Sequence, residues 1–260
     1  MISRKQIVSV TPYITLLICA AAWQFITWFF TLPDWLLPSP ELVWKNTAVR
    51  ASSLPLHFGV TLFETVAGFI LALVIGVPLA MLIVWSPILR NAVYPILVLF
   101  QSIPKISIAP LFLIWVGYGT ESKVLMAFLV AFFPIVVDTA SGLGSTPSEL
   151  VDMSRTLRAT PARVFFGIRL PWALPYVFSG MKVAISLALI GAIIGEFVGS
   201  DTGLGYLILV ASGNMNTGLM FGVITILALM GLGLFLMIEF VERWLCPWYV
   251  SHTAEAPPTA

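Results

Sequence analysis

A few ionisable side chains interrupt stretches of this sequence that are otherwise apolar. A charge in such surroundings is costly unless it faces protein or water, so these residues mark solute pathways, gates or internal ion pairs. They are Glu64, Lys105, Asp138, Lys182 and Glu196, with Gln101 as a neutral companion. Glu64 and Lys182 lie near the ends of their stretches, where solvation or pairing is expected. The candidates for a pathway or gate are therefore Gln101, Lys105, Asp138 and Glu196.

Each candidate also has a structural interpretation, and both interpretations stay open at this point. Glu196 follows Gly195, whose missing side chain permits close helix packing, so its carboxylate can cap or pair across an interface. The same two interpretations hold for Asp138. Lys105 follows Pro104, which predicts a break that exposes backbone groups and a cation to a cavity. The alternative is a lysine that extends to the membrane interface.

The sequence lacks the residue clusters that catalysis or metal binding requires. His57 and His252 are far apart in the chain and poorly accompanied, so they predict no metal site. Cys19 and Cys246 are likewise far apart in the chain, and these two cysteines imply no disulfide framework. No lysine follows a glycine, so the phosphate-binding pattern Gly-x-x-x-x-Gly-Lys-Ser/Thr is absent. We expect neither an enzyme nor a cofactor bound by this chain.

The composition is that of an integral membrane protein. Hydrophobic residues make up 59% of the chain, charged residues only 10%, and the mean hydropathy is +1.01. The net charge of +1 and the scattering of basic residues over several loops argue against nucleic-acid binding.

Long apolar stretches predict an all-α protein with about six membrane spans, each needing roughly 20 apolar residues. The first stretch is too long for a signal peptide and is expected to be a retained span. The six stretches are 12–32, 60–85, 92–116, 123–143, 174–199 and 217–241. The predicted organisation is an N-terminal segment 1–11, a single transmembrane domain 12–245 with a loop at 146–171, and a disordered tail 246–260.

Basic residues predict the orientation, because loops on the cytoplasmic side carry an excess of lysine and arginine. With both termini in the cytoplasm, eight basic residues lie inside: Arg4, Lys5, Arg90, Arg155, Arg158, Arg163, Arg169 and Arg243. Three lie outside: Lys45, Arg50 and Lys123. The 146–171 loop is then cytoplasmic.

The 146–171 loop carries signals for two short helices. Thr146, Pro147 and Glu149 form a capping-box pattern with proline at the first helical position, which predicts a helix start. Thr160-Pro161 repeats the signal, so one helix should end near Ala159 and a second should begin at Pro161. Leu170-Pro171 is expected to stop the second helix before the next span.

The first of these helices has two faces. Leu150, Val151 and Leu157 can face the membrane domain, which leaves polar side chains outward. The outward residues are Asp152, Arg155 and Arg158. Capping and charge alone would equally suit an interfacial helix pair held only by lipid headgroups.

The order of residues in this loop resembles that of binding-protein-dependent ABC import permeases. The family pattern is Glu-Ala-Ala, three residues, Gly, nine residues, then Ile-x-Leu-Pro. Here the register holds as Asp152-Met153-Ser154, three residues, Arg158, nine residues, then Ile168-Arg169-Leu170-Pro171. Arg158 stands where the family has glycine, so we expect a turn that is helical or is formed by Ala159-Thr160.

Further short motifs resemble the nitrate, sulfonate and taurine branch of these permeases, from about residue 35 to 245. They are Leu37-Pro38-Ser39-Pro40, Ser102-Ile103-Pro104-Lys105, Ala109-Pro110-Leu111, Ser179-Gly180-Met181-Lys182 and Gly195-Glu196-Phe197-Val198-Gly199. The chain end from Phe221 to Trp248 is slightly more similar to members that carry pyrimidine precursors of thiamine.

The resemblance implies a type I ABC importer permease fold in the bacterial inner membrane. The implied partners are two ATPase subunits that hold ATP and Mg²⁺, a second permease copy, an extracytoplasmic binding protein and the lipid bilayer. The loop residues implied in ATPase coupling are Glu149, Asp152, Ser154, Arg155, Leu157, Arg158, Ala159, Val164, Ile168, Leu170 and Pro171. The solute stays open among nitrate, sulfonates, taurine, bicarbonate, a pyrimidine thiamine precursor and riboflavin.

The alternative function is a secondary transporter or channel that works without an ATPase. It predicts internal repeats or a row of ionisable residues along one route. Neither is evident in the sequence.

Overall fold

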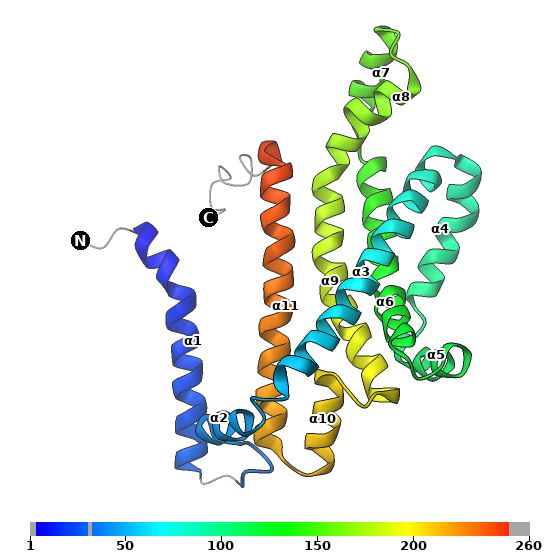
Figure 1. Ribbon diagram of the computed structural model, residues 1–260. Coiled ribbons are helices and arrows are strands. Elements are labelled where there is room, and N and C mark those ends of the chain that lie inside the picture. The colour runs from blue at the N-terminus through cyan, green and yellow to red at the C-terminus, as the bar shows by residue number, and fades with distance from the viewer. Residues whose placement is uncertain (1–3, 31–32, 250–260) are drawn as a thin grey trace.

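The computed structural model describes residues 4–30 and 33–249, and these residues form an all-helical chain (Figure 1). The helices are α1 (Arg4–Phe29), α2 (Pro40–Val49), α3 (Leu54–Trp85), α4 (Pro87–Gln101), η1 (Lys105–Ile108), α5 (Ala109–Val116), α6 (Thr120–Gly144), α7 (Ser148–Thr156), α8 (Pro161–Val164), η2 (Phe165–Arg169), α9 (Leu170–Gly199), α10 (Leu204–Gly213) and α11 (Thr217–Leu245).

Helices α3, α6 and α9 form the centre of the bundle, because small residues let their backbones approach closely. A Cβ on Gly191 of α9 would lie only 2.7 Å from the Met126 carbonyl oxygen of α6. A Cβ on Gly68 of α3 would collide with Ala127 and with the backbone beside it. Alanines that are fully buried, including Ala72, Ala131 and Ala188, continue these interfaces.

The described residues contain four helices long and apolar enough to cross a membrane: α3, α6, the continuous run Pro161–Gly199, and α11. A fifth span results if α4 and the Lys105–Val116 segment are taken together. The first expected span, 12–32, falls largely on α1, which is 26 residues long and contains the apolar helical segment Leu17–Phe29; residues 31–32 lie outside the described residues.

The predicted break at Pro104 is observed. The chain bends by 90° between α4 and the Lys105–Val116 segment, so the expected stretch 92–116 is not one straight helix. Proline lacks the N–H that a continuing helix needs, which explains why α4 ends there. Lys105 stabilises the break, because its Nζ donates to the Gln101 carbonyl at 3.0 Å, at the end of α4.

The two ends of the bundle differ in their basic residues, as the sequence predicted. In Figure 1 the start of α1, the end of α11, the α3–α4 connection and the α7–α8 region lie at one end, and α2 and α10 lie at the other. The first end carries most of the arginines. Helix α1 already begins at Arg4, inside the expected N-terminal segment 1–11, and residues 250–260 of the expected disordered tail lie outside the described residues.

Candidate functional site: the α7–α8 loop and the buried carboxylates

The loop 146–171 protrudes from the bundle as the tip seen at the top of Figure 1, but α7 does not begin as expected. The capping-box prediction is wrong: Pro147 is the N-cap, and no side chain caps the helix. The Thr146 hydroxyl donates backward to the Leu143 carbonyl at 3.3 Å, near the end of α6, and so is not turned toward α7. Glu149 is exposed in the first turn, where a carboxylate favours the helix dipole.

The turn after α7 is made by Arg158 itself, which corrects the expectation of a helical turn or one formed by Ala159-Thr160. Arg158 has φ +57°, a left-handed conformation that normally favours glycine. Its N–H donates to the Arg155 carbonyl at 2.9 Å, and the next N–H, of Ala159, donates to the Ser154 carbonyl at 3.0 Å. These two bonds define a Schellman motif, so Arg158 adopts the geometry of the glycine that it replaces.

The second helix begins as predicted but does not stop as predicted. Thr160 is the N-cap and accepts from the Arg163 N–H at 3.4 Å, with Pro161 at the first position. Leu170-Pro171 does not end the helix: α8 continues through a π-helical turn, η2, directly into α9. The Leu170 N–H bonds to the Phe165 carbonyl, five residues back, and this wider turn accommodates Pro171 within a continuous rod.

Burial divides the loop residues into an anchor and an outer surface. Val151, Ser154 and Val164 are buried, whereas Asp152, Arg155 and Arg158 are exposed as expected. Leu157 does not face the membrane domain, because it lies at the C-cap and is 73% exposed. Ala159, Ile168, Leu170 and Pro171 are partly buried.

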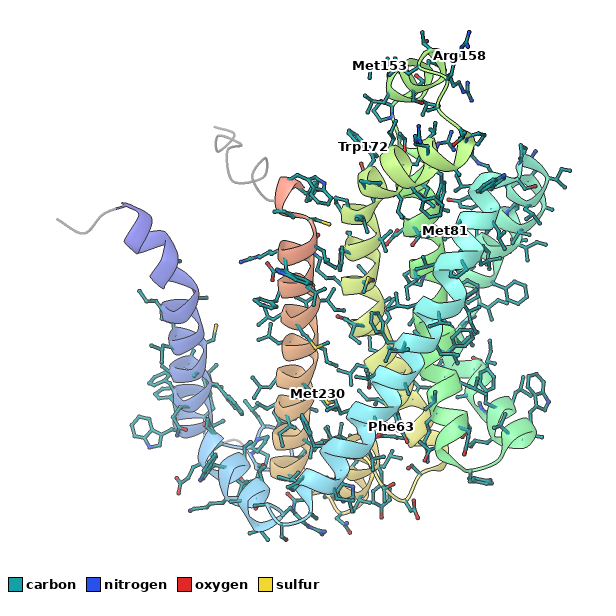
Figure 2. All side chains as sticks on the ribbon, turned by 45° about the horizontal axis from the view of Figure 1, so that its top comes forward. Phe63, Met81, Met153, Arg158, Trp172 and Met230 are labelled. Carbon is teal, nitrogen blue, oxygen red and sulfur yellow. The ribbon has the colours of Figure 1, made fainter. Side chains whose placement is uncertain are left out.

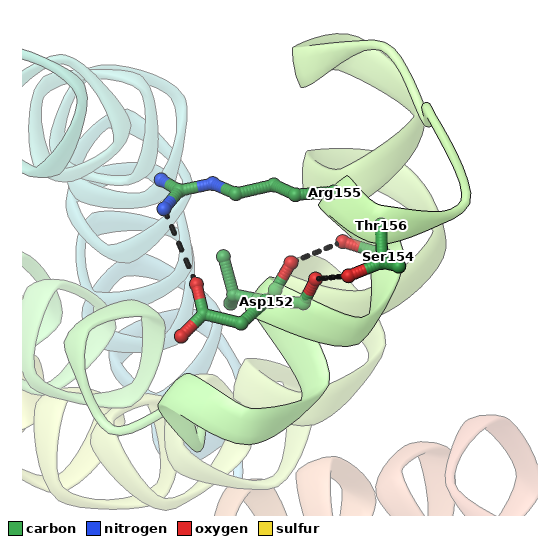
Figure 3. Close-up of polar contacts among 5 residues, drawn as sticks. Asp152, Ser154, Arg155 and Thr156 are labelled. Atoms are coloured by element: carbon green, nitrogen blue, oxygen red, sulfur yellow. Dashed lines mark hydrogen bonds and ion pairs between the residues drawn. The ribbon is translucent and has the colours of Figure 1, made fainter.

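Hydrogen bonds within α7 keep its polar side chains close to the helix (Figure 3). Arg155 forms an ion pair with Asp152 at 3.3 Å, and both side chains are well exposed. The Thr156 and Ser154 hydroxyls donate to the carbonyls of Asp152 and Val151 at 3.0 and 2.6 Å. Figure 2 shows Met153 and Arg158 at the outermost part of the molecule, away from the bundle. The tip therefore offers charged and apolar groups together.

The buried carboxylate Glu196 joins three helices at the opposite end of the bundle. It accepts hydrogen bonds from the Thr61 hydroxyl of α3 and from the Gly205 N–H at the start of α10. Thr61 in turn accepts from the Leu204 N–H at 2.8 Å. Glu196 has no exposed surface, so these contacts favour a structural role for its carboxylate over a role in the pathway or gate.

Glu64 is the second fully buried carboxylate of this cluster, one turn beyond Thr61 on α3. No hydrogen-bond donor among the described residues reaches either of its oxygens, and its carboxyl lies beside that of Glu196. His57 accepts from the Gly203 N–H at 3.0 Å, so His57, Thr61 and Glu64 form a polar stripe on an otherwise apolar helix. Thr61 follows His57 by four residues and Glu64 follows Thr61 by three, which places all three on one face of a helix. This spacing is visible in the sequence, but considering each charged residue separately does not predict the cluster.

The remaining candidates lie apart from this cluster. Lys105 lies 5.6 Å from the ring centre of Phe133, and Gln101 is half-buried beside it. Asp138 is half-buried on α6, and its Cβ lies so near Gly180 of α9 that a side chain there would collide. Lys182 and Glu242 form a 2.6 Å ion pair between α9 and α11, which matches the pairing expected for Lys182.

These features describe a helical membrane subunit with a stiff protruding loop, and comparisons with known proteins identify its class. Residues 52–250 match the family model described as "Binding-protein-dependent transport system inner membrane component". A probable ABC transporter permease of Haemophilus influenzae is 38% identical over 84% of this chain and 89% of that protein. The formylaminopyrimidine transport permease ThiX of Halalkalibacterium halodurans is 35% identical over 91% of this chain and 95% of that protein.

A solved structure gives the same fold. The chain matches one from the inward-facing MetNI methionine ABC transporter with a TM-score of 0.64 and 22% identity, over 73% of this chain and 94% of that one. Other relatives are named as permeases for riboflavin, aliphatic sulfonates, taurine and nitrate.

This chain belongs to the binding-protein-dependent transport system inner membrane component family. It is a permease subunit of an ABC importer with the type I fold, which removes the alternative of a secondary transporter or channel. The resemblance drawn from the 146–171 motif is thereby confirmed at the level of the family.

Proposed function

We propose that the α7–α8 loop couples this permease to a separate ATPase that binds ATP and Mg²⁺. The observation that carries the proposal is the combination of a buried anchor and an exposed tip. Val151 and Val164 are buried and line one pocket together with Val84 and Trp85 of α3, and Asp152, Arg155 and Arg158 remain available to a partner. Met153 and Leu157, four residues apart and 59% and 73% exposed, add an apolar contact surface.

A lever must transmit displacement without bending, and the helical geometry supports this. The run Pro161–Gly199 is continuous through the π-helical turn. Movement of the tip can therefore pass along α9 toward the cluster around Glu196 at the opposite end as a rigid-body motion. The Schellman turn at Arg158 fixes the angle between α7 and α8.

The test is association with the ATPase chain of the same transporter. The double variant Arg155→Glu, Arg158→Glu reverses two exposed charges of the tip, so copurification of the ATPase should fall at least tenfold. Arg243→Glu is the matched control, because Arg243 lies at the same end but pairs with Glu239 on α11. Unchanged association of the double variant would refute the docking role, provided that it elutes from gel filtration like the parent.

We also propose that two copies pair in the bacterial inner membrane, with both termini on the ATPase side. Helix α1 supports this arrangement, because Figure 1 shows it diverging from the bundle along most of its length. Its described contacts include those of Trp23, whose indole N–H donates to the Pro38 carbonyl in the segment before α2 at 3.1 Å and whose ring lies 6.1 Å from that of Phe221 on α11. A second copy would cover the apolar side chains left exposed on α1 and α4.

The proposed solute is a small heteroaromatic compound of the formylaminopyrimidine type, delivered by an extracytoplasmic binding protein. This rests on the name of the relative from Halalkalibacterium halodurans, which matches nearly the whole chain. Gln101, Lys105 and Asp138 are the proposed pathway contacts, since they retain accessible surface. Stimulation of ATP hydrolysis in proteoliposomes by the binding protein loaded with formylaminopyrimidine, but not with taurine, tests the assignment.

A further inference from the structure

A cavity of about 490 Å³ lies between α3, α4 and α6, at the end of the bundle that carries the α7–α8 loop. The end of α3, the first part of α4 and the end of α6 line it, and it is open to the surroundings at Arg90, Asn91 and Ser141, which are exposed. No pathway candidate named above lines it. The lining residues are Ile83, Val84, Arg90, Asn91, Tyr94, Pro95, Ala140, Ser141, Gly144 and Ser145.

Four polar side chains of this cavity are hydrogen-bond donors without a partner among the described residues. Within the described part of the chain, Arg90 has no ion pair, and the side chains of Asn91, Tyr94 and Ser141 make no hydrogen bond. Ser145 differs, because its hydroxyl donates to the Gly142 carbonyl at 2.9 Å. No carboxylate lines the cavity, so its lining carries one positive charge and several unused donors.

The other half of the lining is apolar. Ile83, Val84, Pro95 and Ala140 form that part of the wall. Trp85 follows the lining residue Val84 at the end of α3 and is 64% exposed, and tryptophan side chains prefer the headgroup layer of a bilayer. A ligand that matches both halves has an anionic oxygen-rich head and an apolar flank.

We propose that this cavity binds a phosphate oxyanion, supplied by the headgroup of an anionic phospholipid in the leaflet on the α7–α8 side. The Arg90 guanidinium bonds the phosphate oxygens, and Tyr94, Asn91 and Ser141 donate to the remaining oxygens. Basic pockets between spans on the cytoplasmic side are suited to such headgroups. Free inorganic phosphate presents the same chemistry without the apolar part.

The position of the cavity gives the bound lipid a structural effect. The chain passes from the cavity wall at Ser145, the residue after α6, to the first residue of α7 within three residues. A headgroup that holds α3, α4 and α6 together would therefore fix the base of the α7–α8 loop. This effect is separate from ATPase docking, which involves the exposed tip.

Native mass spectrometry of the purified full-length chain tests the proposal. Phosphatidylglycerol, phosphatidylcholine or inorganic phosphate is titrated in detergent. We expect phosphatidylglycerol to bind the parent chain at least tenfold more tightly than phosphatidylcholine. Arg90→Gln should abolish this preference, and Arg243→Gln, an arginine at the same end that lies outside the cavity, should retain it. A different result would be saturable binding of inorganic phosphate that Arg90→Gln abolishes, with no preference for phosphatidylglycerol over phosphatidylcholine. This result would overturn a lipid as the source of the phosphate and would support an oxyanion site.

A second variant keeps the test decisive if Arg90→Gln is poorly folded. Tyr94→Phe with Ser141→Ala removes two donors and leaves the arginine in place. Its affinity for phosphatidylglycerol should fall roughly threefold to tenfold, as expected for the loss of two hydrogen bonds to a charged group. An undiminished preference in either folded variant would overturn the proposal.

Discussion

Arg158 occupies a backbone conformation that a glycine would adopt without a Cβ clash. A left-handed residue other than glycine costs about 1–2 kcal/mol, partly offset by the greater chain entropy that glycine loses on folding. We predict that Arg158→Gly stabilises the turn by about 1 kcal/mol. The Ala159 amide hydrogen, which is bonded within this turn, should then exchange with solvent roughly fivefold more slowly. Hydrogen exchange of the isolated permease in detergent measures this directly.

Thr156→Gly is the matched control, since Thr156 is in the last turn of α7 and its hydroxyl donates to the Asp152 carbonyl at 3.0 Å. Glycine there weakens the helix, so the same amide should exchange faster. Faster exchange in Arg158→Gly as well would contradict the Schellman assignment.

Glu196 and Glu64 should respond in opposite ways to substitution, although both are completely buried. Glu196→Ala leaves the Thr61 hydroxyl and the Gly205 N–H without their acceptor, so unfolding free energy should fall by at least about 2 kcal/mol. Glu64→Gln replaces a buried carboxyl beside Glu196 with a neutral amide that can donate to the Glu196 carboxylate, so it should change stability little or raise it. Unfolding in a denaturing detergent compares them, and the reverse order would refute the structural role of Glu196.

Cys246 should be a slow-reacting thiol. Burial raises the pKa of its thiol above the ordinary value, and the Glu242 carboxylate raises it further. The thiolate is the reactive form, so a raised pKa means less thiolate at pH 8, and labelling should accelerate about tenfold per pH unit until the raised pKa is passed. A maleimide should thus react more slowly at Cys246 than at an exposed Leu157→Cys; equal rates at pH 8 would show that Cys246 is accessible.

At the scale of elements, the π-helical turn η2 decides how α7 and α8 join α9. A π-helical turn holds one residue more than the α-helical turn that it replaces. We predict that deletion of Gly167, which has open space around it, forces Pro171 into a regular helix at a cost of about 3 kcal/mol. ATPase association and stability should both fall, and adding Pro171→Ala to the deletion should restore them. Failure of this rescue would mean that η2 does not serve to accommodate Pro171.

The elements also show what sequence reasoning can reach. Thr160-Pro161 and Pro104 act through local backbone chemistry, so the α8 start and the break after α4 could be predicted. The missed features depend on tertiary context. Thr146 bonds to the end of α6 instead of capping α7, and Leu170-Pro171 stays helical because the turn before it is widened.

At the scale of the whole molecule, apolar lengths and charge asymmetry were sufficient to predict a helical membrane protein with its arginines at one end, whereas the family required the motif in residues 146–171. The sequence could not reveal that His57, Thr61 and Glu64 meet Glu196 and the start of α10, because these contacts join residues more than 130 positions apart. For the same reason the cavity around Arg90 was not predicted, since α4 and α6 are brought together only by packing.

The most direct measurement is labelling of Leu157→Cys, in a Cys19→Ser background, with a membrane-impermeant maleimide in oriented vesicles. The coupling role requires this residue to lie on the ATPase side and to be covered when the complex assembles. We predict labelling in inside-out vesicles only, and at least tenfold protection when the ATPase chain is bound. Labelling in right-side-out vesicles, or a rate unaffected by the ATPase, would contradict the proposed function.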